Sequence, residues 1–390
     1  MTKRTIFLWI AIISGVSCLG QTTQLDSIFN QGHYRSYQVH LPPAYDGATD
    51  LPLLMALHGG QSDGPSLMAS SDFDEIGDTA NYISLFPTAY KGQWADGRGT
   101  TQAELDGIDD VAFLGQLLDT LISKYAIDTC RLYVTGLSSG GMMTQRLACD
   151  NSGLFTAHAS IMSSLPSVYY PQCQPSQMVN MLMMNGTEDN FSPYAGGPSS
   201  VPSSTGTVTG VDSTINLWAN LAACSNMSSP DSTVYPDINT NDNGYVVKFD
   251  FGPCTSPYEV VLYKVYGGGH TLPGGPGPVF VPIVGYSNKD INGAEHIWNF
   301  FSDKSKCSLA TSVRQAARSE GLSIFPNPVR DILSLRGAES GRDLRVFNSW
   351  GKVVWQGKAS TIEVRDWPSG IYFLGLEGEE NVEWVKFIKL

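Results

Sequence analysis

Charged residues are scarce in this chain of 390 residues, in which Asp, Glu, Lys and Arg together make up 16%. Basic residues are the rarer class, with 24 of them against 37 acidic residues and a net charge of −13. An acidic surface repels phosphate backbones and anionic headgroups, so nucleic acid and anionic membrane surfaces are poor partners and neither is expected. Hydrophobic residues are plentiful at 42%, which is enough for a full-sized core and excludes a wholly disordered chain.

Long apolar runs are absent after the first twenty residues, so no membrane span, which needs about 20 apolar residues, is expected in the mature chain. Lys3 and Arg4 precede an apolar run over 6–16 and small residues over 17–20, the pattern of a secretory signal. We therefore expect residues 1–20 to be a signal peptide and the mature protein to be secreted. Lipidation of Cys18 is the alternative, although the large aliphatic residue usual three positions earlier is missing.

Cysteine pairs with the spacing of zinc ligands are also absent. Of the seven cysteines, Cys18 lies in the signal, and no two of the others are two to four residues apart or close to a histidine cluster. An even number of cysteines in an oxidising compartment predicts disulfides. Neither a metal nor a cofactor is expected. The six remaining cysteines are Cys130, Cys149, Cys173, Cys224, Cys254 and Cys307.

Apolar strand-like runs alternate with helical periods through the first three quarters of the chain. The runs cover 37–41, 51–57, 82–86, 132–135, 178–184 and 258–265, and the clearest helices cover 108–125, 212–223 and 292–301. This alternation predicts an α/β fold with a mostly parallel sheet and helices on both faces. After a break at 308–321, short strands separated by turns predict a small β-sandwich over 322–390. The expected domains are therefore 21–307 and 322–390.

The pattern Gly136-Leu137-Ser138-Ser139-Gly140 lies between the apolar strand and a helix that begins near Gly140. Small residues on both sides of Ser138 permit the tight, strained turn that displays a nucleophilic hydroxyl above a sheet. The helix N-terminus behind this turn helps to hold negative charge. The segment therefore predicts a nucleophile elbow with Ser138 as the nucleophile.

A serine nucleophile needs a base and an acid, which follow it along the chain in this fold. His270 directly follows three glycines after the strand 258–265, whereas His40, His158 and His296 lie within predicted elements, as structural histidines do. His270 is therefore the expected base. Asp189 ends the turn after the strand 178–184 and is the expected acid; its neighbour Glu188 is the alternative.

Leu57-His58-Gly59-Gly60 ends the strand 51–57 and matches the loop that donates a backbone N–H to an oxyanion hole. Gly60 is the expected donor together with the amide of Ser139, and Gln61 is the alternative to Gly60. His58 is expected to support this loop. Trp94 follows the strand 82–86 and is expected to line the substrate subsite, with a buried structural role as the alternative.

Further segments accompany these motifs. They are His58-Gly59, Trp94, Asp109-Asp110-Val111, Tyr133 to Ser138, Gly140-Gly141-Met142-Met143, Arg146-Leu147-Ala148-Cys149, Gly186-Thr187 with Asp189, and Gly268-Gly269-His270-Thr271. Together they resemble the secreted poly(3-hydroxybutyrate) depolymerase and feruloyl/acetylxylan esterase group of α/β-hydrolases over about 37–301. The resemblance implies serine carboxylesterase activity without a metal, and the same triad of Ser138, Asp189 and His270.

Two positions depart from this family. Leu272 stands where family members commonly have Trp, and Asn185 stands where they have His. The resemblance therefore assigns Leu272 to the substrate subsite. The loss of the aromatic side chain there leaves the acyl specificity open. The family's habit implies the disulfides Cys149–Cys173 and Cys224–Cys254, which close short loops. Cys130–Cys307 is then expected to tie the strand that enters the elbow to the end of the last helix.

The tail carries a second resemblance. Its segments are Phe325-Pro326-Asn327-Pro328, Asp331, Val346-Phe347-Asn348, Gly351, Pro368 to Tyr372 and Lys386-Phe387-Ile388-Lys389. They resemble the C-terminal sorting domain read by the type IX secretion system of Bacteroidetes, over about 323–390. The resemblance implies the type IX machinery as a partner; a carbohydrate-binding sandwich is the alternative.

The expected function is a secreted serine carboxylesterase that acts through an acyl-enzyme. Its expected substrate is a polyester or an acylated plant polysaccharide. A serine peptidase on the same fold is one alternative, and a non-catalytic surface binding protein is another. The triad is complete, which argues against the second alternative.

Overall fold

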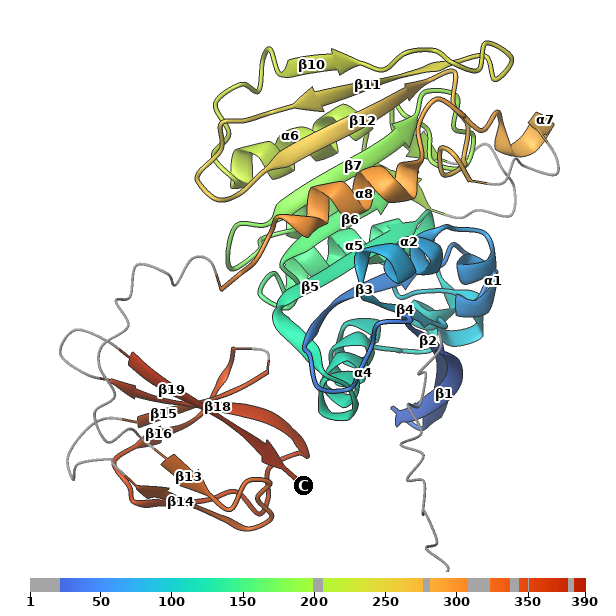
Figure 1. The fold of residues 1–390 in the computed structure, drawn as a ribbon. Helices are drawn as coiled ribbons and strands as arrows, with labels where there is room; N and C mark the ends of the chain where they lie inside the picture. The colour runs from blue at the N-terminus through green and yellow to red at the C-terminus, as the bar shows by residue number, and fades with distance from the viewer. Residues whose placement is uncertain are drawn as a thin grey trace, which may run out of the picture.

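The computed structural model describes residues 22–198, 206–275, 281–307, 323–336, 344–349, 351–377 and 382–390. The expected signal peptide at 1–20 and linker at 308–321 lie outside the described residues. Figure 1 shows an N-terminal unit (22–307) built on one large sheet and a smaller C-terminal unit (323–390) made of strands. Within these described ranges, no helix combines the length and the apolar character that crossing a membrane requires.

A ten-stranded sheet forms the centre of the N-terminal unit, in the order β1-β2-β4-β3-β5-β6-β7-β12-β11-β10. The inner strands from β4 to β12 run parallel to one another, and the outer strands on both edges are antiparallel. The strands are β1 (Thr22–Asn30), β2 (His33–Leu41), β3 (Leu51–Leu57), β4 (Ile83–Pro87), β5 (Ile127–Leu137), β6 (Ala157–Ile161), β7 (Asn180–Gly186), β10 (Asp231–Val234), β11 (Tyr245–Asp250) and β12 (Val260–Tyr266).

Helices cover both faces of this sheet because its inner strands are apolar on both sides. In β3, Leu53 and Met55 pack on one face with α4, and Leu54 packs on the other with α1, α2 and α8. Helix α5 shares the face of α4, and α6 continues that layer over β7 and β12 (Figure 1). The bounds are α1 (Gly64–Ala69), α2 (Phe73–Ala80), α3 (Gln102–Leu105), α4 (Asp110–Lys124), α5 (Ser139–Asp150), α6 (Val211–Leu221), α7 (Val281–Val284) and α8 (Gly293–Ser302).

The predicted α/β fold is confirmed, and the strand predicted over 51–57 has the same bounds as β3. The edge strands were not predicted. β10 reads Asp-Ser-Thr-Val and is exposed along its whole length, so it lacks the apolar alternation by which a half-buried strand is recognised. β1 is likewise mostly exposed.

The C-terminal unit consists of a three-stranded sheet, β13-β14-β17, and a four-stranded sheet, β16-β15-β18-β19. Side chains from both sheets meet in one core, among them Leu333, Val346 and Phe387, so the predicted β-sandwich is present. The strands are β13 (Ser323–Phe325), β14 (Ile332–Arg336), β15 (Leu344–Asn348), β16 (Val353–Gly357), β17 (Thr361–Glu363), β18 (Gly370–Glu377) and β19 (Val382–Lys389).

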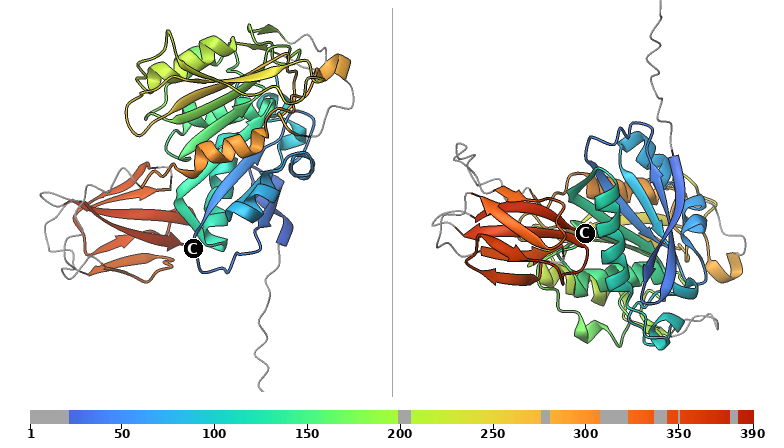
Figure 2. Two further views of the ribbon diagram at one scale, coloured as in Figure 1. Left: turned by 45° about the horizontal axis from the view of Figure 1, so that its top comes forward. Right: turned by 90° about the horizontal axis from the view of Figure 1, so that it is seen from below.

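The C-terminal unit lies against the side of the N-terminal unit that carries α4, as Figure 2 shows in orange and red. The Ser349 hydroxyl donates a hydrogen bond of 2.6 Å to Oδ2 of Asp119 on α4, and burial raises the pKa of Asp119 to about 6. A cavity between the units is lined by Thr129 near the start of β5 and by Phe347 of β15. The contact is therefore near the amino ends of the parallel strands, away from their carboxyl ends.

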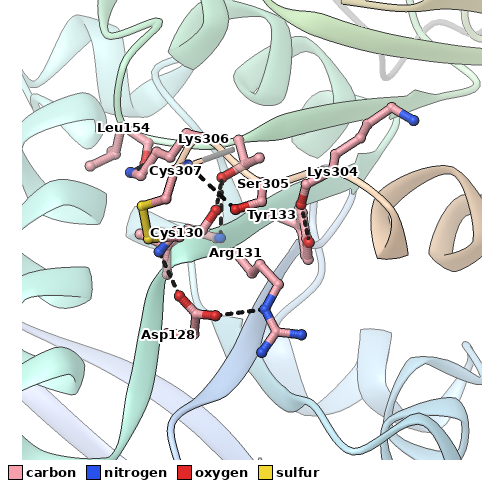
Figure 3. Close-up of a disulfide and its surroundings, with 11 residues drawn as sticks. Asp128, Cys130, Arg131, Tyr133, Leu154, Lys304, Ser305, Lys306 and Cys307 are labelled. Carbon is pink, nitrogen blue, oxygen red and sulfur yellow. Dashed lines mark hydrogen bonds and ion pairs between the residues drawn. A yellow bond between two sulfur atoms is a disulfide. The ribbon is translucent and has the colours of Figure 1, made fainter. Parts of the chain in front are cut away.

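Three disulfides join the cysteines in the pairs Cys130–Cys307, Cys149–Cys173 and Cys224–Cys254, the pairs that the sequence led us to expect. Figure 3 shows the first of them, which links the start of β5 to the segment after α8. The Lys306 N–H donates to the Cys130 carbonyl at 3.1 Å, and its ammonium donates to the Leu154 carbonyl at 3.2 Å. These bonds hold the last residues of the N-terminal unit against β5.

We predict that the long-range disulfide stabilises the protein more than a local one. Cys130 and Cys307 are 177 residues apart and Cys149 and Cys173 are 24 apart, so chain entropy favours the first crosslink by about 2 kcal/mol. Replacing both Cys130 and Cys307 by Ala should lower the free energy of unfolding by that much more than the same change at Cys149 and Cys173. Urea unfolding under non-reducing conditions measures both losses, and an equal or smaller loss for the long-range pair would contradict the prediction.

Candidate active site

Ser138 occupies a sharp turn between the end of β5 at Leu137 and the start of α5 at Ser139. Its backbone angles are φ 58° and ψ −120°, a conformation that non-glycine residues rarely adopt and that stores strain. The Ser138 N–H donates to the carbonyl of Ile161 on the neighbouring strand β6 at 2.8 Å. The turn is thus held by the sheet, as the nucleophile-elbow prediction requires.

The glycines on both sides of this turn are required by close backbone contacts. A β-carbon on Gly136 would lie 2.2 Å from the Gly140 carbonyl oxygen, and one on Gly140 would lie 2.1 Å from the Leu57 carbonyl oxygen. Neither backbone oxygen can move without displacing β3 or α5. Any side chain at these two positions would therefore separate the helix from the sheet and dismantle the turn.

The structure brings His270 and Asp189 together. The imidazole Nδ1 lies 2.7 Å from Oδ2 of Asp189, and because a carboxylate only accepts hydrogen bonds, Nδ1 carries the proton and Nε2 can accept one. Oδ1 of Asp189 accepts from the backbone N–H groups of Phe191 and Ser192 at 2.8 and 2.9 Å. Glu188 is exposed on the same loop, so the geometry favours Asp189 over its neighbour as the partner of His270.

The other histidines in predicted elements have structural surroundings. His40 bonds to the Thr23 hydroxyl and to Asp78, each at 2.8 Å. His158 is fully buried, and burial lowers its pKa to about 3. His296 lies 3.3 Å from the Tyr263 hydroxyl. None of the three lines the cavity that contains Ser138.

His58 supports the loop expected to form the oxyanion hole. Its Nε2 accepts the Ala89 N–H at 2.9 Å, and its Nδ1 lies 2.6 Å from the Gly59 carbonyl oxygen. These two bonds require the neutral tautomer with the proton on Nδ1, and burial lowers the pKa of His58 to about 4. The side chain therefore acts as an uncharged brace between the loop and the end of β4.

The amide of Gln61 is already engaged, since it donates to the Gly92 carbonyl oxygen at 2.8 Å. Of the two candidates from this loop, the geometry therefore favours Gly60 as the oxyanion donor. A β-carbon on Gly60 would lie 3.9 Å from the β-carbon of Ser139, which places the two expected donors on neighbouring stretches of backbone. Both residues line the cavity that contains Ser138.

That cavity, of about 340 Å³, contains Ser138 and His270 together. One part of its lining is apolar and comprises Leu67, Leu137 and Phe191; another part is polar and comprises Gln61, Ser62, Ser70, Gln93, Arg98 and Thr101. Apolar surface with a few convergent polar groups is typical of a small-ligand site.

A buried ion pair forms the wall next to Ser139. Both oxygens of the fully buried Asp96 accept hydrogen bonds from the Arg98 guanidinium, at 2.8 to 3.2 Å. Oδ2 of Asp96 also accepts from the Ser139 hydroxyl at 2.7 Å. The pair therefore anchors the first residue of α5, whose amide is an expected oxyanion donor. Sequence motifs did not reveal this network, because Asp96 and Arg98 meet Ser139, 43 positions after Asp96, only through folding.

The structure corrects both residues assigned to the substrate subsite. Trp94 has no exposed surface, and its indole N–H donates to the His58 carbonyl at 2.9 Å. Trp94 is thus a structural tryptophan beneath the loop, held inward by a hydrogen bond. Leu272 packs in the core beside Met184 and Gly293, because the chain turns inward after His270. Neither side chain lines the cavity.

Parallel strands carry the Ser138 turn after β5, the Asp189 loop after β7 and the His270 loop after β12. The N-terminal unit has the α/β-hydrolase fold. The expected nucleophile, acid and base follow in this order along the chain, each at the carboxyl end of a strand, which is the arrangement of this fold.

The N-terminal unit is similar in sequence to several curated proteins. The putative esterase NocK of Nocardia uniformis subsp. tsuyamanensis is 25% identical over 286 residues, covering 72% of this chain and 82% of that protein. The bifunctional acetylxylan esterase/xylanase XynS20E of Neocallimastix patriciarum is 23% identical, covering 62% of this chain and 31% of that protein. Feruloyl esterase B of Piromyces equi is 27% identical, with coverages of 60% and 42%. The chain thus spans less than half the length of the last two relatives.

The C-terminal unit matches a family model. Residues 323–390 correspond to the secretion system C-terminal sorting domain, so the sorting-domain prediction for the tail is confirmed.

We predict that His58 makes the fold sensitive to acid. Its pKa is lowered from 6.5 to about 4, so the unfolded chain takes up a proton below pH 6.5 that the folded chain excludes until about pH 4. The free energy of unfolding should therefore fall by about 3 kcal/mol from this residue as the pH decreases through that window. In His58→Gln the pH dependence should become shallower by this amount, measured by urea unfolding between pH 4 and 7.

The exposed His33 provides the matched control, since His33→Gln should keep the slope of the unaltered protein. Equal slopes for His58→Gln and the unaltered protein would show that His58 takes up its proton in the folded state as readily as in the unfolded chain.

Proposed function

We propose that this protein is an exported serine carboxylesterase with Ser138 as nucleophile, His270 as base and Asp189 as the acid that orients it. The observation that carries the proposal is the cavity in which the strained Ser138 turn and the Asp189-bonded imidazole of His270 lie together. Three relatives named as esterases support it. Similar serine sites on this fold hydrolyse carbonyl compounds through an acyl-enzyme.

In the proposed reaction, Nε2 of His270 takes the hydroxyl proton of Ser138 as Oγ attacks the ester carbonyl carbon. The amides of Gly60 and Ser139 hold the negative charge that develops on the carbonyl oxygen. The ester C–O bond then breaks, and the imidazolium returns its proton to the leaving alcohol. Water repeats the cycle on the acyl-enzyme, releasing the acid and regenerating Ser138.

An ester of a polysaccharide hydroxyl group is the substrate class that the cavity favours over a polyester. The polar part of the lining includes Gln61, Gln93 and Thr101, and these side chains can hydrogen-bond to sugar hydroxyl groups. A polyester has no hydroxyl groups along its chain and offers them only carbonyl acceptors. The apolar part is small and suits a short or aromatic acyl group. Two relatives named for acetylxylan and feruloyl esterase activity agree with this choice.

The alternatives have less support. A peptidase shares the triad, but the three relatives reported above are named as esterases. A purely binding protein would not need the strained Ser138 turn or the buried Asp189 carboxylate bonded to His270.

Export is proposed to use both ends of the chain. The signal at 1–20 would direct the chain across the inner membrane, and the sorting domain at 323–390 would then be read by the type IX secretion machinery. The sandwich contacts the hydrolase near the amino ends of its parallel strands, so it leaves the cavity at their carboxyl ends unobstructed.

Replacing the nucleophile tests the reaction. Ser138→Ala removes the atom that forms the acyl-enzyme and changes one small side chain, so the fold should persist while kcat falls ~10⁴–10⁶-fold. The measurements are kcat on p-nitrophenyl butyrate and mass spectrometry of a phosphonate adduct on the peptide that contains Ser138. An adduct on another serine, or near-native turnover by the variant, would refute the assignment.

Neighbouring carboxylates provide the matched control. Asp189→Asn should cost no more than Ser138→Ala but should still reduce kcat severely, because it misorients the imidazole. Glu188→Gln, one residue away and exposed, should leave kcat within twofold of the unaltered enzyme, roughly as surface changes do.

Truncation tests the division between catalysis and export. A chain that ends after Cys307 should keep its kcat, since the proposed catalytic residues and all six disulfide cysteines remain. A chain that ends after Lys306 loses the Cys130 partner and should be about 2–5 kcal/mol less stable. In the native host both truncated chains should accumulate in the periplasm, which cell fractionation and activity assays would detect. Normal release of either chain to the medium would overturn the export assignment.

A further inference from the structure

Phe191 connects the acid, the base and the cavity. It lies two residues after Asp189, and its N–H donates to Oδ1 of that carboxylate at 2.8 Å. Its ring stacks on the imidazole of His270, with ring centroids 4.8 Å apart and an angle of 26° between the planes. The side chain is partly exposed and lines the cavity with Ser138.

The chemistry of ester cleavage defines which part of the substrate lies beside the imidazole. The proton that leaves Ser138 travels through His270 to the oxygen of the departing alcohol, so that oxygen must come within hydrogen-bond distance of the imidazole. The rest of the alcohol then lies against groups that flank the imidazole. Phe191 is the group that covers one face of this ring.

We propose that Phe191 forms the aromatic wall of the alcohol subsite and also fixes the plane of the His270 ring. This inference rests on the proposed esterase function. An aromatic face packs well against the flat, C–H-bearing face of a pyranose ring and gains little from a short alkyl alcohol. The alcohol that the subsite takes is therefore a sugar hydroxyl group on a pyranose ring, with the polar lining of the cavity available to the other hydroxyl groups.

Stacking also serves the base directly. A ring that packs parallel to the imidazole restricts rotation about its Cβ–Cγ bond, which keeps Nδ1 aligned with Asp189. It further places π-electron density beside the imidazolium that forms during each proton transfer. Phe191 is therefore a positioning residue for His270 and a specificity residue for the alcohol.

The experiment compares two esters that share an acetyl group and differ in their alcohol, a mono-acetylated methyl xyloside and ethyl acetate. For Phe191→Leu, which keeps an apolar side chain but loses the ring, kcat/KM on the xyloside ester should fall roughly tenfold more than on ethyl acetate, mainly through KM. A smaller fall in kcat common to both esters reports the loosened imidazole. Phe191→Tyr keeps the ring, so its kcat/KM on the xyloside ester and its kcat on both esters should match those of the unaltered enzyme. Phe191→Met repeats the test if the Leu variant folds poorly.

Phe29 supplies the control, because its ring is 57% exposed on β1 and does not line the cavity; Phe29→Leu should leave both esters unaffected. Equal losses on the two esters, no loss at all, or failure of Tyr to restore the xyloside ester would each overturn the inference. Failure of the proposed function is distinguishable, since the unaltered enzyme would then hydrolyse neither ester and take no phosphonate on Ser138.

Discussion

Backbone packing around Ser138 is the constraint on which the rest of the site depends. The strands β3 and β5 and the helix α5 approach so closely that positions 136 and 140 accept only glycine. This approach holds Ser138 in its strained conformation and brings the Ser139 amide beside the loop at Gly60. The proposed acid and base need no comparable strain, because their loops are joined by the Asp189–His270 hydrogen bond. Rigidity is concentrated where the proposed nucleophile and the proposed oxyanion donors must keep a fixed spacing.

A chain with few charges places several of them inside. Arg35 pairs with the fully buried Asp110 at 2.7 Å, and the other oxygen of Asp110 accepts the Ala95 N–H. The next loop residue, Asp96, holds Arg98 and the hydroxyl of Ser139. Removing one member of such a buried pair leaves an uncompensated charge and typically costs about 3–5 kcal/mol. These pairs therefore fix the loop that forms one wall of the cavity. Apolar side chains in the same loop would supply no directional bonds to hold it.

The two units divide their tasks between opposite ends of the parallel strands. The proposed catalytic residues lie at the carboxyl ends, and the sorting domain contacts the side near the amino ends through Ser349 and Asp119. The Cys130–Cys307 disulfide closes the hydrolase just before the chain leaves for the sorting domain. The disulfide and the proposed catalytic residues therefore all precede the segment that leads to the sorting domain.

The amino-acid sequence by itself determined the features that are local along the chain. The strand, turn and helix around Ser138 lie within one short segment, and Asp189 and His270 each follow a recognisable strand in the order that the fold requires. The β-sandwich of the tail was equally evident from its short strands and turns. Edge strands such as β10 escaped recognition because their polar, exposed residues carry no apolar period.

Only the tertiary structure decided how distant segments contact one another. It buried Trp94 by a hydrogen bond to the His58 carbonyl, turned Leu272 into the core and engaged the Gln61 amide with Gly92. It also stacked Phe191 on His270. These residues are 79 positions apart, and no sequence motif predicts their contact. The physical reason is that a motif reports the backbone conformation of a few neighbouring residues. The direction of a side chain depends instead on the backbone groups and rings that folding brings next to it from remote parts of the chain.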